Sequence, residues 1–206
     1  MADQETKAES SGISRRGFLK GVGTGTVASG LLNDFHQDVA AAEGIPLRGP
    51  GQTPITLNIN GKERRLEVEP RVTLLDALRN RLDLTGSKKV CDRGTCGACT
   101  VIIDDEPVYS CSMLAVEAEG RSITTIEGLG TPQNMNPVQE AFIKHDAQQC
   151  GFCTPGFVVA CTAFVHKNPQ ASTEDVRAGL GGNLCRCGTY AGMIEAVVEA
   201  AKKGVA

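Results

Sequence analysis

Apolar and polar residues alternate on both sides of an Asn60-Gly61 pair, a pattern typical of a β-hairpin. An Asn-Gly pair favours a two-residue turn because both residues tolerate positive φ. The apolar positions of the two predicted strands are Ile55, Leu57, Ile59, Leu66 and Val68. Because alternate side chains share one face of a strand, the sequence predicts a hairpin that is buried on one face.

A helix is predicted directly after this hairpin. Thr73 is a candidate N-cap, and Asp76 falls in the first turn, where a negative charge is favourable. The leucines at helical spacing are Leu74, Leu75, Leu78 and Leu82. They predict a helix that lies across the hairpin.

A second hairpin follows at residues 101–103, with a turn at 104–106 and a return strand from 108 onward. Residues 122–126 are predicted to be a closing strand. Two hairpins, one helix and a closing strand together form a small α+β unit.

The pattern changes to helices beyond Gly130 and Pro132. Four helices are predicted, at residues 137–147, 155–166, 172–180 and 190–203. The first, second and fourth show an apolar face, and the first two are expected to be buried on one side. The sequence therefore predicts an α+β first domain at residues 55–130 and an all-α, four-helix domain at residues 131–206.

The composition restricts the function classes. A chain of 206 residues is long enough for one or two small domains, and its net charge of -3, without a basic stripe, argues against a nucleic-acid partner. Nine cysteines indicate either a disulfide framework or metal sites. Their spacing favours metal.

The first cysteine group is Cys91, Cys96, Cys99 and Cys111. This C-x4-C-x2-C…C spacing is that of a plant-type [2Fe-2S] site. Glycines within the loop permit positive φ, so that backbone amides can approach the sulfurs and donate hydrogen bonds to them. Disulfides or a structural zinc are the alternatives, but zinc sites normally show paired C-x2-C hooks.

The second cysteine group is Cys150, Cys153, Cys185 and Cys187. Each pair stands directly before a predicted helix, where free amides and the helix dipole favour an anionic ligand. A second [2Fe-2S] centre fits this arrangement, although a zinc site with four thiolates remains open from spacing alone. The ninth cysteine, Cys161, falls on an apolar helical pattern and is expected to be a buried, inert thiol.

The amino-terminal residues 14–20 read Ser-Arg-Arg-Gly-Phe-Leu-Lys, with the paired arginines at Arg15 and Arg16. The segment resembles a twin-arginine (Tat) export signal, whose machinery accepts folded proteins. The hydrophobic run that follows is too short and too rich in Gly, Thr and Ser for a stable membrane span. Small residues at 40–42 predict cleavage after Ala42, so residues 1–42 are read as a signal peptide and 43–54 as a linker.

Residues 55–203 resemble the small iron-sulfur subunit of the molybdenum hydroxylases, the xanthine dehydrogenase and aldehyde oxidoreductase family. The matching segments are Leu-Thr-Gly-Ser-Lys-Lys from Leu84, Cys-Asp-Arg-Gly-Thr-Cys-Gly-Ala-Cys-Thr-Val from Cys91, Ile-Thr-Thr-Ile-Glu-Gly-Leu from Ile123, Gln-Cys-Gly-Phe-Cys-Thr-Pro-Gly from Gln149 and Gly-Asn-Leu-Cys-Arg-Cys-Gly-Thr-Tyr from Gly182. The first domain likewise resembles the β-grasp fold of plant-type ferredoxins. Val90 departs from the family, which usually has Gly before the first cysteine.

The resemblance implies a non-catalytic electron-transfer subunit of an oxidoreductase. Electrons would pass from a molybdopterin-binding large subunit through two [2Fe-2S] clusters to an FAD subunit. By analogy the second cysteine group lies nearest the pterin, with Gln149 a possible pterin contact, and the first group faces the flavin. Together with the export signal, the resemblance points to a periplasmic aldehyde oxidoreductase.

Two other functions remain open. The chain is alternatively the iron-sulfur subunit of a xanthine, nicotinate, isoquinoline or carbon monoxide dehydrogenase type of enzyme, or a free-standing two-cluster electron carrier. We find no Walker loop, dinucleotide fingerprint or Ser-His-Asp set that indicates catalysis by this chain itself. His145 and His166 are expected to be surface or capping residues, and Lys88, Lys89 and Arg93 to be solvated charges or salt-bridge donors to a partner.

Overall fold

The computed structural model describes residues 16, 20 and 48–204, and divides the chain into the units Met1–Arg48 and Gly49–Ala206. Most of the predicted signal peptide, including Arg15 and the cleavage point after Ala42, therefore lies outside the described residues. Within it, Arg16 and Lys20 are exposed helical residues. The account below concerns the second unit.

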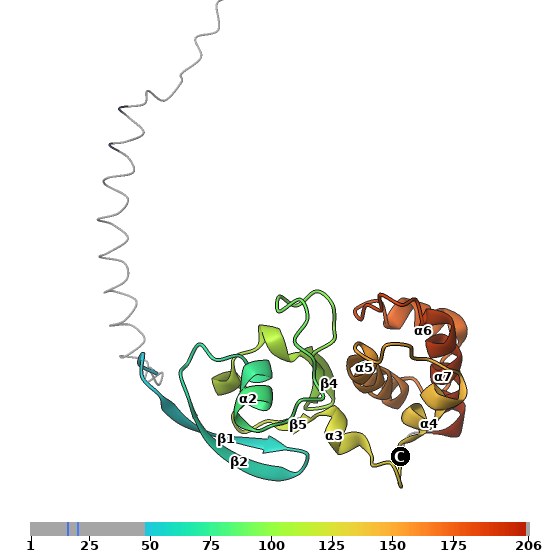
Figure 1. Cartoon of the computed structure of the whole chain (residues 1–206), viewed down its shortest axis with the longest axis horizontal. Helices are drawn as coiled ribbons and strands as arrows, with labels where there is room; N and C mark the ends of the chain where they lie inside the picture. The colour runs from blue at the N-terminus through green and yellow to red at the C-terminus, as the bar shows by residue number, and fades with distance from the viewer. Residues whose placement is uncertain (1–15, 17–19, 21–47, 205–206) are drawn as a thin grey trace, which may run out of the picture. The chain divides into compact units, whose positions relative to one another are not determined.

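The first half of this unit contains a five-stranded mixed sheet with the strand order β2-β1-β5-β3-β4 (Figure 1). Its strands are β1 (Thr53–Ile59), β2 (Lys62–Val68), β3 (Thr100–Ile103), β4 (Glu106–Tyr109) and β5 (Ser122–Thr124). The predicted first hairpin is present, with Asn60 and Gly61 at φ of 52° and 72° in its turn. Strand β5 pairs in parallel with β1 and antiparallel with β3, so it occupies the middle of the sheet.

The predicted helix, α2 (Leu74–Arg81), packs on this sheet. The side chain of Thr73 caps it by accepting a hydrogen bond from the amide of Asp76 at 3.2 Å. Leu74 and Leu78 are fully buried against the apolar faces of β1 and β3. Leu75, which is also fully buried, packs instead against Cys99 and Cys111, so the helix supports the first cysteine group directly.

The second half is helical. Its helices are α3 (Ile126–Leu129), α4 (Pro137–Lys144), α5 (Thr154–Lys167), α6 (Thr173–Gly179) and α7 (Tyr190–Lys203). The four predicted helices are all present, and α3 is a short additional one that the sequence analysis did not predict. Helix α4 ends three residues before the predicted 147, because Asp146 takes a positive φ of 48° there. Asn136 caps α4 and Ser172 caps α6 through reciprocal capping boxes.

Helix α5 differs from the prediction that it is buried on one side. Eight consecutive residues, 156–163, are buried, so every face of the helix is covered along this stretch. The reason is that α5 packs against α4 and α7 and also against β3 and β4 of the first domain. Helix α5 is thus part of the core of the helical domain and also packs on the sheet of the first domain.

The observed architecture is α+β, a ferredoxin-like β-grasp domain followed by a helical domain, as predicted. Each half has its own apolar core, with Leu57, Val101 and Ile123 in the first and Val138, Phe142 and Val197 in the second. No helix in the described part of the chain is long and apolar enough to cross a membrane.

Candidate metal centres

The first cysteine group lies at the edge of the β-grasp domain. Cys91, Cys96 and Cys99 come from the loop that precedes β3, and Cys111 comes from η1 (Ser110–Ser112), a 3-10 turn directly after β4. The return strand of the second hairpin delivers Cys111, as expected, although Cys111 itself lies in this turn. The thiols of Cys91 and Cys96 are neighbours, and so are those of Cys99 and Cys111.

Left-handed backbone conformations fold this loop around the thiols. Gly94 and Gly97 take φ of 68° and 69°, and Asp92 takes 55°. The amide of Gly94 then donates to the sulfur of Cys111 at 3.3 Å, and the amide of Thr95 donates to the sulfur of Cys91 at 3.4 Å. The prediction that loop amides point at the sulfurs is confirmed.

These contacts give the thiols different acidities. Hydrogen bonds from the amides of Thr95 and Arg93 lower the pKa of Cys91 to about 6, whereas burial raises the pKa of Cys99 to about 12. A thiol binds metal as its thiolate. The exposed side of the loop therefore presents a thiolate at neutral pH, and the buried side would release its proton when metal binds.

The second cysteine group gathers at the start of two helices. Cys153 is the N-cap residue of α5, and Cys150 lies three residues before it. Cys185 and Cys187 precede α7, whose N-cap is Thr189. The thiols of Cys150 and Cys187 are in contact, as are those of Cys153 and Cys185.

Residues at the start of α7 hold Cys185 in place. The hydroxyl of Thr189 donates to the sulfur of Cys185 at 3.2 Å, and the amide of Cys185 donates to the hydroxyl of Tyr190 at 2.8 Å. Partial burial would raise the pKa of Cys185, but the hydrogen bonds from Thr189 lower it to about 7. Burial raises the pKa of Cys153 to about 12. This group thus repeats the combination of a low-pKa and a high-pKa thiol.

The donor set fits two iron-sulfur clusters. All nine cysteines are free, so the structure contains none of the disulfides considered as an alternative. Each group consists of two neighbouring thiol pairs, which supplies the four thiolates that a [2Fe-2S] cluster requires, two for each iron.

A backbone hydrogen bond joins the two groups directly. The amide of Leu184 donates to the carbonyl oxygen of Cys96 at 3.0 Å. Cys96 belongs to the first group, and Leu184 is bonded to Cys185 of the second. The two groups therefore lie on loops that touch each other.

The other predicted residues divide into core and surface positions. Cys161 is fully buried, as predicted, and burial raises the pKa of its thiol far above the ordinary range. His145, the residue after α4, bonds to Glu195 and Glu199 on α7, and His166 is exposed at the end of α5.

The basic residues near the first group make internal contacts. Lys89 forms ion pairs with Asp76 at 2.9 Å and Asp92 at 3.1 Å. Lys88 donates to the carbonyl of Thr85 and Arg93 donates to the carbonyl of Cys91.

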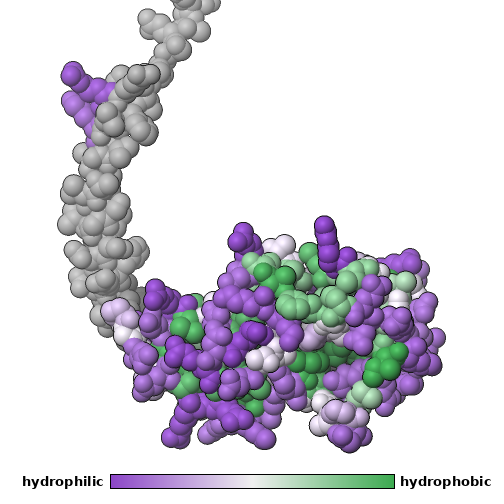
Figure 2. All heavy atoms as spheres, viewed as in Figure 1, coloured by the Kyte–Doolittle hydropathy of each residue, from purple (hydrophilic) through white to green (hydrophobic). Residues whose placement is uncertain are grey.

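Several exposed apolar residues flank the cysteines. Val90 precedes Cys91, Phe152 lies between Cys150 and Cys153, and Leu184 precedes Cys185; each of the three is more than half exposed. Gln149, the predicted pterin contact, is exposed next to Cys150. The face shown in Figure 2 is mostly hydrophilic and is interrupted by apolar patches.

Three residues at the join of the domains were not predicted to have a role. They are Tyr109, Gly156 and Asn183, and all of them contact the opposite domain. Asn183 belongs to the Gly-Asn-Leu-Cys segment, so the sequence shows that it lies two residues before Cys185. The sequence gives no signal for its contact with Gly97, because the two residues are 86 positions apart.

Two protein-family models match the chain. A 2Fe-2S iron-sulfur cluster binding domain matches residues 57–124, and a [2Fe-2S] binding domain matches residues 125–198. The two matches meet where β5 ends, and together they cover both cysteine groups.

Curated relatives are iron-sulfur subunits of oxidoreductases. The aldehyde oxidoreductase iron-sulfur-binding subunit PaoA of Escherichia coli (strain K12) is 41% identical over 204 residues, covering 92% of this chain and 88% of that protein. The nicotine 6-hydroxylase small subunit of Paenarthrobacter nicotinovorans is 47% identical over 146 residues, covering 71% of this chain and 88% of the relative.

Two solved structures of oxidoreductases are also similar to this chain. A chain of quinoline 2-oxidoreductase from Pseudomonas putida 86 matches with a TM-score of 0.70 and 46% identity, covering 75% of this chain and 99% of its own length. The aldehyde oxidoreductase from Desulfovibrio desulfuricans ATCC 27774 matches with a TM-score of 0.69 and 46% identity, covering 72% of this chain and 17% of the larger chain.

Proposed function

The chain belongs to the iron-sulfur subunits of the molybdenum hydroxylases, and on that premise we propose that it carries electrons within a periplasmic aldehyde oxidoreductase. In this proposal a large subunit holds molybdopterin, a third subunit holds FAD, and this chain connects them. The chain itself is an electron-transfer subunit and performs no substrate chemistry.

One observation carries the proposal. Eight of the nine cysteines form two groups of four, and a backbone hydrogen bond from Leu184 to Cys96 joins the loops that hold them. We assign Cys91, Cys96, Cys99 and Cys111 to the first [2Fe-2S] cluster and Cys150, Cys153, Cys185 and Cys187 to the second. When bound, each cluster supplies one-electron redox chemistry.

The chain's own residues set the environment of each cluster. The amides of Gly94 and Thr95 are donors to sulfur, and such hydrogen bonds are one of the factors that tune a cluster potential. The Thr189 hydroxyl does the same at Cys185. Differences in burial and hydrogen bonding between the two groups support an ordered pair of potentials.

The exposure of the second group suits contact with the large subunit. Cys150 and Cys187 are exposed, and Gln149, Phe152 and Leu184 are exposed around them. A partner that covers this surface would bury apolar side chains and bring its pterin next to a cysteine pair. The first group, with Val90 and Cys91 at the surface, would then face the flavin subunit.

Aldehyde as the substrate class is supported by the extent of the match to PaoA. Residues 1–54, which precede the first domain, are about a quarter of the 206 residues. An alignment that covers 92% of the chain must therefore include part of this amino-terminal extension. The match to the nicotine 6-hydroxylase subunit covers 71% of the chain and need not include any of it. The higher identity to the latter, 47% against 41%, favours a nitrogen-heterocycle hydroxylase as the second candidate.

The periplasmic location is supported by the sequence around Arg15 and Arg16, which resembles a twin-arginine export signal. The Tat machinery exports folded proteins. This route suits a chain whose thiols bind metal in the cytosol during folding, before they meet an oxidising compartment.

Purification from its native cells tests the proposal. We expect a complex that contains molybdenum, FAD and about four iron atoms per copy of this chain, with two distinct [2Fe-2S] signals in electron paramagnetic resonance (EPR) spectra after dithionite reduction. The complex should oxidise aldehydes faster than nicotine or nicotinate. The opposite preference would favour the second candidate.

Other results would replace the proposal. A monodisperse two-cluster chain without a molybdenum partner would indicate a free-standing carrier. A colourless chain that contains zinc would contradict both cluster assignments.

A further inference from the structure

Two loops from different domains meet between the cysteine groups, and one side chain connects them. The first loop contains Cys96 and Gly97, and the second contains Gly182 and Asn183. The two loops are in close contact, since a Cβ placed on Gly97 would lie 2.6 Å from the Asn183 side chain and 2.8 Å from the Gly182 oxygen.

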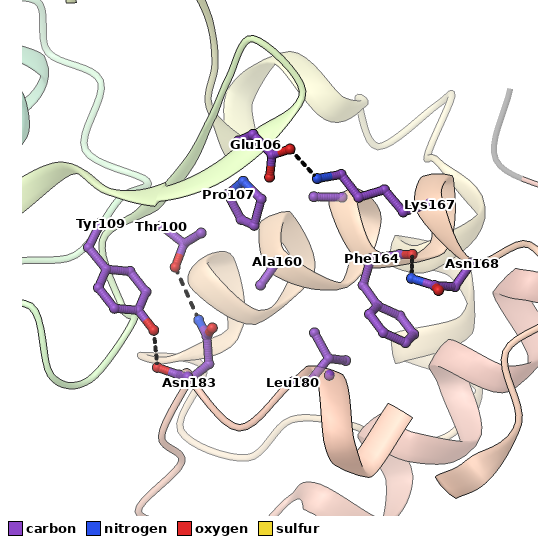
Figure 3. Close-up of a pocket in the computed structure, with 13 residues that line it drawn as sticks. Thr100, Glu106, Pro107, Tyr109, Ala160, Phe164, Lys167, Asn168, Leu180 and Asn183 are labelled. Carbon is purple, nitrogen blue, oxygen red and sulfur yellow. Dashed lines mark hydrogen bonds and ion pairs between the residues drawn. The ribbon is translucent and has the colours of Figure 1, made fainter. Parts of the chain in front are cut away.

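Asn183 uses both hydrogens of its amide group across this contact. Its Nδ2 donates to the carbonyl oxygen of Gly97 at 2.8 Å. The same Nδ2 donates to the hydroxyl oxygen of Thr100 at 3.2 Å (Figure 3). The Thr100 hydroxyl donates in turn to the same Gly97 oxygen at 2.6 Å. Asn183 is 6% exposed, so the bonds are shielded from water. Buried hydrogen bonds of this kind are unfavourable to leave unmade, which fixes the geometry of the loops.

The position of these bonds relates them to the clusters. Gly97 follows Cys96, and Asn183 lies two residues before Cys185. The backbone hydrogen bond from Leu184 to Cys96 is therefore flanked by the bond from Asn183 to Gly97. Loss of the Asn183 side-chain bonds would therefore remove a constraint on the loops that this direct connection joins.

Tyr109 makes a second connection between the same loops. Its hydroxyl donates to the carbonyl of Gly182 at 2.6 Å (Figure 3). Its ring packs against Cys99 and Cys111. Figure 3 also shows an ion pair between the domains, from Lys167 to Glu106. Both side chains are largely exposed, so this ion pair contributes little to stability. In the part of the chain that the structure describes, Asn183 and Tyr109 thus supply the side-chain hydrogen bonds between the loops of the two cysteine groups.

We propose that Asn183 is a positioning residue that sets the distance and electronic contact between the two [2Fe-2S] clusters, with Tyr109 as its auxiliary. This inference rests on the proposed function, because it takes both groups to hold clusters. It assigns to Asn183 no contact with iron. Its effect would come from keeping Leu184 bonded to Cys96.

The magnetic interaction between the two reduced clusters tests the inference. The dipolar interaction of two unpaired electrons falls with the cube of their separation, so it reports the distance between clusters independently of turnover. We would record EPR spectra at low temperature on the fully reduced complex with wild-type chain, Asn183→Ala, Tyr109→Phe and the control Asn168→Ala. Asn168 is a matched control because its Nδ2 donates to a backbone carbonyl, that of Phe164, within the helical domain alone.

The inference predicts splitting of both cluster signals in the wild type and in Asn168→Ala. Asn183→Ala should retain both clusters at full intensity but show a narrower splitting than the wild type, and Tyr109→Phe should narrow it less. If Asn183→Ala does not fold, the more conservative Tyr109→Phe decides, because it removes only a hydroxyl. Unchanged splitting in a folded Asn183→Ala, or in Tyr109→Phe when the alanine variant does not fold, overturns the inference. So does a wild type that has two clusters and no splitting.

These outcomes are separate from failure of the proposed function. If the wild-type complex contains no pair of [2Fe-2S] signals, then the cluster assignment itself is wrong. If it contains both and the variants behave like the control, then only the role of Asn183 is wrong.

Discussion

Gly156 touches the backbone of Gly97 across the join of the two domains. A Cβ at residue 156 would lie 2.4 Å from the Gly97 carbonyl oxygen and 2.9 Å from the Cα of Ala98. Gly156 is in the first turn of α5, and Gly97 is in the loop of the first cysteine group. The glycine is needed for this approach of α5 to the loop, since no other residue lacks a Cβ.

Gly156→Ala is therefore expected to destabilise the protein, although Ala is the better helix former. Overpacking against backbone atoms should lower the stability by about 1–3 kcal/mol. The midpoint of thermal loss of the visible cluster absorbance measures this. Gly181→Ala is the matched control, because no atom lies within 4 Å of a Cβ there. Equal midpoints for the two variants would contradict the close contact.

Loss of a single cysteine pair should remove one cluster and leave the other. Cys185→Ser with Cys187→Ser is expected to reduce iron from about four to about two atoms per chain, since each [2Fe-2S] cluster is held by four cysteines. One of the two EPR signals should vanish. Cys96→Ser with Cys99→Ser should remove the other signal. Loss of both signals in either variant would show that the two domains do not hold their clusters independently.

Cys161 should be dispensable for metal binding. It is fully buried in the helical core, and the structure places it outside both cysteine groups. Cys161→Ala should keep both EPR signals and full iron content, with a loss of stability of about 1 kcal/mol from the small cavity. Iodoacetamide should not label Cys161 in the folded protein, because burial keeps its thiol protonated. Loss of iron in this variant would assign it a ligand role.

The ion cluster around Glu199 predicts a pH-dependent contribution to stability. Lys144, His145 and Lys203 surround this carboxylate at 2.7, 2.7 and 3.0 Å, and hydrogen bonds from Lys144 first, then His145 and Lys203, lower its pKa to about 2. A carboxylate with a lowered pKa stabilises the folded state above its unfolded pKa of about 4.3, and this contribution is lost as the pH falls toward 2.

Glu199→Gln should therefore lower the thermal midpoint at pH 7, and the difference from wild type should not shrink between pH 8 and pH 5. It should decline only below about pH 4.3. Glu195→Gln is the control, because Glu195 is more exposed and its ion pair with His145, at 3.3 Å, is longer than those of Glu199. A difference that disappears between pH 8 and pH 5 would contradict the role of Glu199.

Export should depend on the paired arginines. Replacing both Arg15 and Arg16 by Lys preserves the charge but not the twin-arginine motif, so we expect the loaded chain to accumulate in the cytosol. Cell fractionation followed by immunoblotting measures this. Replacement of Lys20 by Arg is the control and should leave the chain in the periplasm. A wild-type chain found in the cytosol would contradict the proposed location.

The sequence was sufficient for those features that depend on local spacing. The turn at Asn60-Gly61, the Thr73 cap and the positive φ of Gly94 and Gly97 are all confirmed, because each arises from residues within a few positions of one another. The grouping of Cys91, Cys96 and Cys99 follows from one short loop in the same way.

Features that depend on tertiary contacts were not predictable. The burial of α5 on all faces requires its packing on β3, and nothing in its own apolar pattern shows which element covers the second face. The contact of Asn183 with Gly97 joins loops from two domains, so the local sequence carries no signal for it. The sequence predicts that Lys89 is a solvated charge or a salt-bridge donor to a partner. In the folded loop it instead forms ion pairs with Asp76 and Asp92 of its own chain.

The central position of β5 determines the order in which the first domain can be completed. Its pairing partners β1 and β3 precede it in the chain, and the parallel register joins Asn58 to Ser122. The ribosome must therefore release residue 124 before the two earlier hairpins can become one sheet, although all four cysteines of the first group have been synthesised by then. Contacts of such long sequence separation form slowly. Nascent chains would consequently carry a complete set of thiols on an unfinished sheet, so the loop of the first centre reaches its final geometry only after β5 has been added.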